Sequence, residues 1–146
     1  MNPWATISPG RVQPCSLFSS QKMNKGDCLV YCIANAAASR TYVGWTNHWA
    51  RRLRQHKGEI KGGAHSTRSY GPGAHPLFHV QGFKTQRHAR QLEWLLHRRH
   101  GPGYARKRKE SMMTWRLRRL GMAMKLERFT KDAPVTADAG LVTIIF

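Results

Sequence analysis

The stretch RTYVGWTNHWARRLRQH, Arg40 to His56, decides the fold because two kinds of regular structure meet within it. Its first part, Thr41 to Trp45, consists mostly of β-branched and aromatic residues, which are enriched in strands. Successive residues of a strand point to opposite faces, so Tyr42 and Gly44 share one face. The stretch therefore predicts a strand that leads, within a few residues, into a basic helix.

The second half of the stretch has the spacing of an amphipathic helix that stops near Gly58. Thr46 or Asn47 can supply a side-chain oxygen to cap its first turn. Residues on one helical face recur every three or four positions, which places four side chains together: Trp49, Arg52, Leu53 and His56. Two of these four are polar, so the helix can direct an arginine and a histidine toward the preceding strand.

An apolar run, CLVYCIA from Cys28 to Ala34, predicts a strand before this one. Only the short segment NAAASR separates the two strands, which favours an antiparallel hairpin. Period-two alternation puts Leu29, Tyr31 and Ile33 on one face. With a suitable register, Tyr31 can therefore lie beside the tyrosine of the second strand.

The segment 57–75 is rich in glycine, histidine and lysine and predicts a loop whose backbone amides can approach a phosphate closely. A third strand, PLFHVQGF, follows at 76–83, and Thr85 is a candidate cap for a helix over 86–100. Glu93 lies at the edge of that helix's apolar stripe, which consists of Ala89, Leu92, Leu95 and Leu96. Glu93 therefore interrupts the apolar stripe and does not lie on the polar face of the helix.

The C-terminal part predicts a basic amphipathic helix from Ala105 to Arg128, whose inward-facing residues include Met112, Trp115, Leu120 and Met124. The terminal segment GLVTIIF is strand-like and needs a partner edge. We divide the chain into a disordered leader at 1–26, a central domain at 27–103 and a helix-and-strand extension at 104–146. Met23 could serve as the start of translation.

Charge limits the classes of partner. Among 146 residues, 25 Lys and Arg face 7 Asp and Glu, a formal net charge of +18. That excess is well beyond the magnitude of about 2 to 8 that keeps a small domain soluble, and it favours nucleic acid as the partner. The three cysteines form no C-x-x-C pair, so neither a zinc finger nor a disulfide framework is indicated. No apolar run approaches the length of about 18 residues that a membrane span needs.

Five features together resemble the GIY-YIG nuclease superfamily. They are Leu29-Val30-Tyr31, then Tyr42-Val43-Gly44, an arginine and a histidine on the next helix, and a glutamate on the helix after the third strand. The run ARRLRQHKGEIKGGA is most similar to the catalytic subunit of the eukaryotic endonuclease that cuts branched DNA. The cysteine- and histidine-rich zinc module of that subunit is not among these residues, because no cysteine follows Cys32.

The resemblance implies an α+β (α/β) fold of the GIY-YIG type, a small three-stranded antiparallel sheet flanked by helices, here extended by the C-terminal basic helix and terminal strand. It also implies metal-dependent hydrolysis of phosphodiester bonds in branched or flapped DNA. The catalytic residues it implies are Tyr31, Tyr42, Arg52, His56 and Glu93.

Each implied role suits its side chain. Tyr31 would serve as general base or orient the attacking water, and Tyr42 would bond a phosphate oxygen or that water. Arg52 would hold the scissile phosphate and His56 would assist the base. Glu93 would bind one Mg²⁺ or Mn²⁺ ion, since Mg²⁺ often uses only one or two protein carboxylates. A helix salt bridge to a neighbouring basic residue is the structural alternative for Glu93.

Further basic and polar residues are candidates for phosphate contacts that position the duplex without reading its sequence. They are Arg40, Arg51, Lys57, Lys61, His65, Thr67, Arg68, Lys84 and Arg87. We expect an intracellular protein acting in the nucleus or at another site of DNA replication, with a scaffold subunit or a second copy of itself as a further partner. The main alternative is a non-catalytic basic nucleic-acid-binding protein that keeps the fold, and a sequence-specific nuclease is a third possibility.

Overall fold

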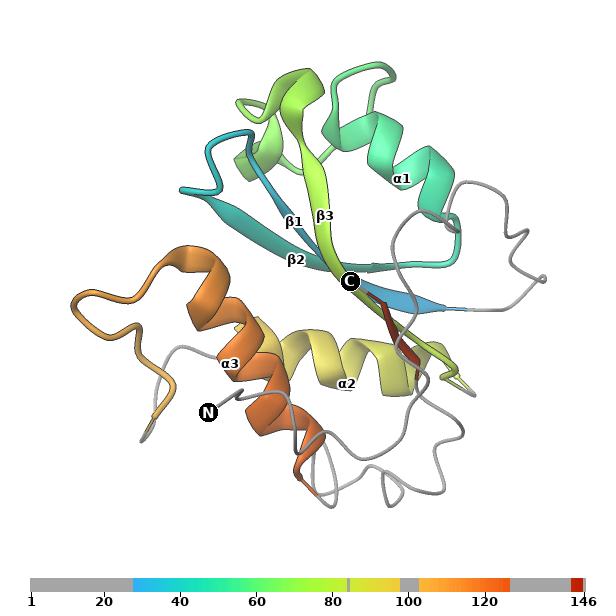
Figure 1. The fold of residues 1–146 in the computed structure, drawn as a ribbon. Coiled ribbons are helices and arrows are strands. Elements are labelled where there is room, and N and C mark those ends of the chain that lie inside the picture. Colours follow the sequence, from blue (N-terminus) through green and yellow to red (C-terminus); the bar gives the residue numbers. More distant parts are fainter. Residues whose placement is uncertain (1–27, 84, 98–102, 127–142, 146) are drawn as a thin grey trace.

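The computed structural model describes residues 28–83, 85–97, 103–126 and 143–145. The predicted leader at 1–26 lies outside these residues. The described elements follow the expected order of a strand hairpin, a helix, a third strand and further helices (Figure 1).

The sheet is built around β1 (Leu29–Ala34), whose six residues are all buried. On one side β1 pairs antiparallel with β2 (Thr41–Thr46), and on the other with β3 (His75–Gln81). This confirms the predicted three-stranded antiparallel sheet. The terminal segment supplies a further strand, β4 (Thr143–Ile145), which pairs with the free edge of β3 and gives the order β2-β1-β3-β4. The partner edge that this segment requires is therefore within the same chain.

The tight connection between β1 and β2 depends on Asn35. The side-chain oxygen of Asn35 accepts a hydrogen bond from the backbone N–H of Arg40 at 2.9 Å. Its backbone carbonyl accepts one from the N–H of Ala38 at 2.8 Å. Ala38 takes up a positive φ of 52° in this turn. The turn fixes the register in which Tyr31 stands opposite Gly44 and Ile33 stands opposite Tyr42.

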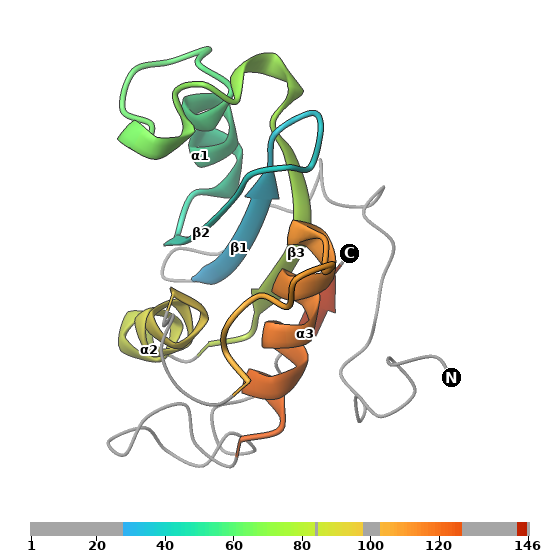
Figure 2. The same ribbon diagram turned by 90° about the vertical axis from the view of Figure 1, so that its left-hand side faces the viewer.

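Helices cover both faces of the sheet. Figures 1 and 2 show α1 (Trp49–His56) on one face and α2 (Gln86–His97) and α3 (Met112–Met124) on the other. Alternation along the strands divides the apolar core accordingly. The core on the α2 and α3 side includes Val30, Cys32, Val43, Phe78, Val80, Leu92 and Leu96. The smaller core on the α1 side includes Leu29, Tyr31, Ile33 and Trp49.

The C-terminal helix is shorter than the predicted span of Ala105 to Arg128. It begins only after Ser111, whose side chain accepts a hydrogen bond from the N–H of Thr114 at 3.1 Å. Residues before it form turns, in which the carboxylate of Glu110 accepts from the N–H of Lys107 at 2.9 Å. The prediction missed this end because the basic run resembles a continuous helical surface, whereas local side-chain bonds to the backbone compete with helix formation.

Two arginines of α3 point into the protein. Arg116 donates to the carbonyl of Leu96 at 3.1 Å, and Arg119 donates to the carbonyl of Leu95 at 2.6 Å. These carbonyls belong to the last turn of α2, where intrahelical donors run out. Part of the positive charge of the chain is thus structural and holds α3 against α2.

Cys28 and Cys32 are both buried in the core. Burial raises the pKa of the Cys32 thiol to about 12, although the charge of Arg116 opposes the shift. These cysteines therefore act as small core residues. No helix among the described residues has the length and apolar character needed to cross a membrane.

Candidate active site

Tyr31 lies at the centre of the site, in the middle of β1 and fully buried. Its ring crosses the neighbouring strand at Gly44, the residue directly opposite in the register. A Cβ atom at Gly44 would lie 2.5 Å from the Tyr31 hydroxyl oxygen and 2.7 Å from its Cζ atom. The glycine at this position thus makes room for the Tyr31 ring.

The Tyr31 hydroxyl joins the strand to α1. Its oxygen is 2.7 Å from Nε2 of His56 and accepts a hydrogen bond from Nε–H of Arg52 at 3.0 Å. Arg52 can only donate, so the Tyr31 hydrogen is available for the histidine. The helix therefore brings Arg52 and His56 to one phenol, as their spacing predicts.

The other ring nitrogen of His56 meets Thr67. Nδ1 of His56 lies 2.8 Å from Oγ1 of Thr67, and that hydroxyl donates to the carbonyl of Ala64 at 2.9 Å. Thr67 belongs to the short 3₁₀ turn His65–Thr67 and is fully buried. The structure thus places Thr67, a predicted phosphate contact, inside the protein with its hydroxyl bonded there, so its contact with DNA has no support from this position.

Burial keeps both members of the tyrosine–histidine pair neutral at pH 7. It raises the pKa of the Tyr31 phenol well above its ordinary value, although the hydrogen bond from Arg52 opposes this shift. Burial, followed by the charge of Arg52, lowers the pKa of His56 to about 4. The resting pair is consequently a protonated phenol facing an unprotonated imidazole nitrogen.

Arg52 is held in place by its own helix and by the glycine-rich loop. Its Nη1 donates to the side-chain oxygen of Gln55 at 3.1 Å and to the carbonyl of Gly62 at 3.2 Å. Gln55 in turn donates to the carbonyl of Lys61 at 3.2 Å. Tyr31 and Tyr42 also hold this guanidinium: burial lowers the pKa of Arg52, but its hydrogen bonds with the two phenols outweigh burial and raise it. Sequence reasoning missed Gln55, although its position three residues after Arg52 was the available signal.

Tyr42 borders the same cluster but is only partly buried. Its ring centroid lies 5.2 Å from that of His56 and 6.4 Å from that of Tyr31. The two tyrosines are diagonal neighbours across β1 and β2, because the residue opposite Tyr31 is Gly44. Tyr42 thus presents a phenol at the border between the buried pair and solvent.

Glu93 approaches the cluster across the outer edge of β2. Its neighbour one turn later, His97, anchors α2 to that strand with Nε2 2.8 Å from the carbonyl oxygen of Val43. Burial raises the pKa of Glu93, and the charges of Arg90 and Arg52 partly oppose this shift. A salt bridge within the helix, the alternative role for Glu93, is weak in the structure. Its Oε1 lies 3.8 Å from Nε2 of His97, and that nitrogen already faces the carbonyl of Val43.

The residues able to ligate a metal are few. Within the described residues, no group of three or more His, Cys, Asp and Glu side chains is placed to hold an ion. Glu93, with a side chain 23% exposed, therefore offers a single carboxylate. One carboxylate fits a hard divalent ion that keeps most of its water ligands, but does not fit a closed zinc site.

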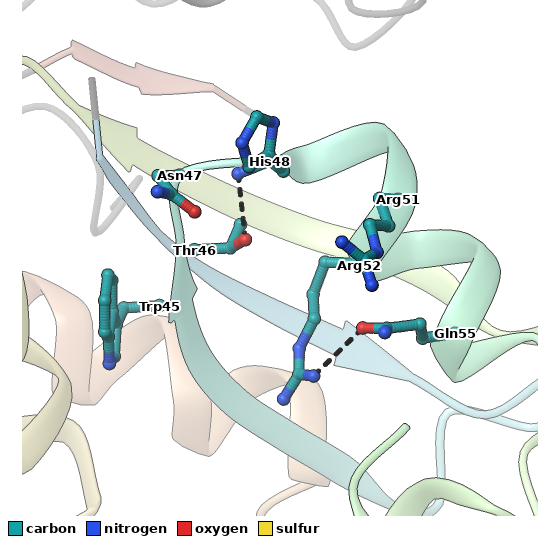
Figure 3. A pocket seen from close by; sticks show the side chains of 7 residues that line it. All are labelled: Trp45, Thr46, Asn47, His48, Arg51, Arg52 and Gln55. Carbon is teal, nitrogen blue, oxygen red and sulfur yellow. Dashed lines mark hydrogen bonds between the residues drawn. The ribbon is translucent and has the colours of Figure 1, made fainter. Parts of the chain in front are cut away.

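A pocket of about 210 Å³ opens beside Arg52, between α1 and the end of β2. Figure 3 shows Trp45 on one side and Gln55 on the other, with the Arg52 guanidinium extending between them. No acidic residue lines it, so it favours an anion.

The predicted cap of α1 is wrong: the hydroxyl of Thr46 accepts from the N–H of His48 at 3.0 Å, and no side chain caps the helix.

The remaining candidates for phosphate contact are distributed over the surface. Arg51 lines the first pocket, and Lys61 and Arg68 line a second hollow, which Gln55 shares with the first. Lys57 is partly exposed, and three more are exposed: Arg40, His65 and Arg87. Lys84 lies outside the described residues. The structure thus places Arg51, Lys61 and Arg68 around the Arg52 site, while their contact with DNA remains a prediction.

The space at Gly44 gives a test of the packing around Tyr31. We expect Gly44→Ala to lower the free energy of unfolding by about 1 to 3 kcal/mol, the usual cost of overpacking a core, because the rigid Tyr31 ring must shift. Urea denaturation measures this change. Gly121→Ala is the matched control: no atom lies within 4 Å of its added Cβ, and alanine favours a helix interior by up to about 1 kcal/mol. Equal stability of Gly44→Ala and the wild type would contradict the described contact.

The environment of His56 gives a second test. An NMR titration of the folded protein should show the His56 imidazole changing charge near pH 4, against about 6.5 in the urea-unfolded chain. Because the unfolded chain binds this proton first, the contribution of His56 to folding stability is present above pH 6.5 and declines as the pH falls toward 4. Titration near 6.5 in the folded protein would show that the imidazole is not buried against Tyr31.

Comparisons with known proteins agree with this geometry. The GIY-YIG catalytic domain family matches residues 27–109. A structure-specific endonuclease subunit slx1 of Schizosaccharomyces japonicus is 48% identical over 69 residues, which are 47% of this chain and 25% of the relative. The SLX1 homolog of Giardia intestinalis is 41% identical over 68 residues, covering 44% and 19% of the two chains. Human SLX1 is 41% identical over 70 residues, covering 47% and 25%.

The chain spans a quarter or less of the length of these curated relatives, and the similarity falls on the nuclease domain. The family match is broader, because it covers more than half of the 146 residues and contains Tyr31, Tyr42, Arg52, His56 and Glu93. The chain therefore belongs to the GIY-YIG catalytic domain family.

Proposed function

We propose that this chain is a metal-dependent endonuclease that hydrolyses phosphodiester bonds in branched or flapped DNA. The observation that carries the proposal is the Tyr31 hydroxyl held between Nε2 of His56 and Nε of Arg52, at 2.7 and 3.0 Å. The choice of branched DNA rests on the relatives, which are named structure-specific endonuclease subunits. The chain covers a quarter of the length of these relatives, so the substrate is argued from that quarter alone.

Arg52 would hold the scissile phosphate. A guanidinium offers several donors in a fixed plane that matches a phosphate, and Arg52 lines the pocket beside the Tyr31 hydroxyl to which it donates. In this position it would also stabilise the charge that develops on the phosphate oxygens as the bond breaks. Arg51, exposed on the same pocket, would contact a neighbouring phosphate.

Tyr31 and His56 would take the proton of the attacking water. The Tyr31 oxygen accepts that proton while the phenol hydrogen passes to Nε2 of His56, so no free phenolate has to form. Tyr31 is fully buried while Arg52 donates to it, and binding of a phosphate by Arg52 would uncover its oxygen. Sharing the Arg52 charge with a phosphate would also remove one of the two causes that lower the pKa of His56. The leaving oxygen takes its proton from solvent.

Tyr42 would orient the water or a phosphate oxygen at the mouth of the site. It is the partly exposed phenol of the pair, and its ring lies next to those of Tyr31 and His56. A phenol on a partly exposed side chain beside Arg52 suits this role, whereas the buried Tyr31 is suited to proton transfer.

Glu93 would hold one Mg²⁺ or Mn²⁺ ion. Its carboxylate is half-buried beside the charge of Arg52 and has no strong ion pair. A divalent ion bound there would supply electrostatic stabilisation of the leaving oxygen and polarise the phosphate. A single carboxylate favours one ion over a two-metal site.

Further partners follow from the same relatives. They are named as subunits, so we propose that this chain works with a scaffold subunit or with a second copy of itself. An endonuclease of branched DNA acts on intermediates of repair, recombination or replication, so we propose that this chain acts inside the cell, in the nucleus where there is one. Its surface basic residues would hold the duplex by its phosphates.

The carboxylate gives the sharpest test of this function. Glu93→Gln keeps the shape of the side chain and deletes its charge, so Mg²⁺-dependent cleavage of a 5′-flap DNA should fall by about 10²-fold or more while DNA binding is retained. Single-turnover cleavage and a binding titration, both with purified protein and with EDTA as a reference, measure the two effects.

The matched control is Glu59→Gln. Glu59 is exposed and forms a surface ion pair with Arg54 at 3.1 Å, so it loses the same charge away from the site and should cleave like the wild type. Full activity of Glu93→Gln would contradict the metal assignment. Tight binding without cleavage by the wild type, with or without a scaffold subunit, would favour the non-catalytic DNA-binding alternative.

A further inference from the structure

We infer that Thr67 is a positioning residue that fixes the tautomer of His56 and thereby sets the direction of proton transfer from Tyr31. The inference rests on the proposed function for its effect on cleavage, whereas the tautomer itself follows from the hydrogen bonds. It gives an interior role to a loop whose sequence indicated phosphate binding.

The first step concerns the single hydrogen of the Thr67 hydroxyl. Oγ1 lies 2.9 Å from the carbonyl oxygen of Ala64, an atom that can only accept, so the hydroxyl hydrogen points there. Oγ1 also lies 2.8 Å from Nδ1 of His56. While its hydrogen is directed to this carbonyl, the hydroxyl accepts from His56. The hydrogen of the neutral imidazole is therefore on Nδ1.

The second step follows at the other end of the ring. A neutral imidazole carries one N–H, so a hydrogen on Nδ1 leaves a lone pair on Nε2. That lone pair faces the Tyr31 hydroxyl at 2.7 Å. The Tyr31 oxygen accepts from Arg52, and its own hydrogen is directed to His56. All the donors run in one direction, from Arg52 through Tyr31, His56 and Thr67 to the Ala64 carbonyl.

The opposite tautomer would stop this transfer. A hydrogen on Nε2 would point at a Tyr31 oxygen that already receives the hydrogen of Arg52, and the phenol hydrogen would lose its acceptor. Nδ1 would then accept a hydrogen bond only if the Thr67 hydroxyl turned toward it and gave up its own bond to the Ala64 carbonyl at 2.9 Å. Thr67 thus disfavours the one arrangement in which His56 cannot accept a proton.

The position of Thr67 in the chain makes this role dependent on the loop. Its turn is closed by the N–H of Thr67, which donates to the carbonyl of Ala64 at 3.0 Å. The same loop holds Arg52 through the carbonyl of Gly62. The segment between α1 and β3 therefore orders two polar groups of the site, His56 and Arg52, from the side opposite the sheet.

The test uses Thr67→Val and Thr67→Ser. Valine has nearly the shape of threonine without the hydroxyl, and serine keeps the hydroxyl. Long-range ¹H–¹⁵N NMR of the histidine rings at pH 7 in the full chain reports which nitrogen of His56 carries hydrogen. We expect Nδ1–H in the wild type and in Thr67→Ser, and a shift toward Nε2–H in Thr67→Val.

Cleavage of a 5′-flap DNA with Mg²⁺ is the second measurement. Thr67→Val should cleave at least about tenfold more slowly, toward the loss of about 10⁴-fold that a catalytic histidine in the wrong tautomer causes in a hydrolase triad. DNA binding should stay unchanged, and Thr67→Ser should restore most of the rate. A general loss of structure would instead lower binding and thermal stability together.

The two measurements separate the inference from the proposed function. An Nε2–H tautomer in the wild type would overturn the inference, whatever the protein cleaves. An Nδ1–H tautomer that persists in Thr67→Val with an unchanged rate would overturn it too. If the wild type shows Nδ1–H, loses it in Thr67→Val and yet cleaves no DNA, the assignment to Thr67 stands and the proposed function fails. If Thr67→Val does not fold, the tautomers of the wild type and Thr67→Ser decide.

Discussion

The pair of hydrogen bonds at the Tyr31 hydroxyl is the interaction on which the rest of the site depends. It connects the central strand to α1 through His56 at 2.7 Å and Arg52 at 3.0 Å, inside a part of the core that excludes water. A buried polar group is costly unless its partners are in place, so helix, loop and neighbouring strand are all constrained to satisfy this phenol. Gly44 is part of that constraint, because the ring occupies the space of its missing side chain.

The arrangement also explains why the two faces of one small sheet carry different tasks. The face covered by α2 and α3 holds the larger apolar core, stabilised by arginines that donate to the last carbonyls of α2. The face covered by α1 is smaller and holds the polar cluster. Glu93 belongs to the first layer but reaches the second across the edge strand β2, where His97 bonds the Val43 carbonyl. An edge strand is what allows a helix on one face to contribute to a site on the other.

Local sequence patterns predicted much of this. The strand alternation and the helical spacing correctly brought Tyr31, Tyr42, Arg52 and His56 together, because both patterns are read within a few residues. Features that depend on distant contacts were not predictable: the role of Gly44 requires the register of β1 against β2, and Thr67 looked like a surface residue of a basic loop. The beginning of α3 was missed because Ser111 caps the helix and the carboxylate of Glu110 holds the residues before it in turns, so the helix begins later than the basic run suggests. The pairing of the terminal strand with β3 likewise depends on the whole sheet.

In the proposed function, the Tyr31 hydroxyl moves a proton during cleavage in addition to filling space in the core. The most direct measurement is the single-turnover rate at which Tyr31→Phe cleaves a 5′-flap DNA with Mg²⁺, compared with the wild type. The substitution keeps the ring that packs against Trp49 at 5.1 Å between centroids and removes only the oxygen. The account predicts a rate lower by about 10² to 10⁴-fold, the usual contribution of a positioned acid or base, with DNA binding unchanged. A rate equal to that of the wild type would contradict it and return Tyr31 to a purely structural role.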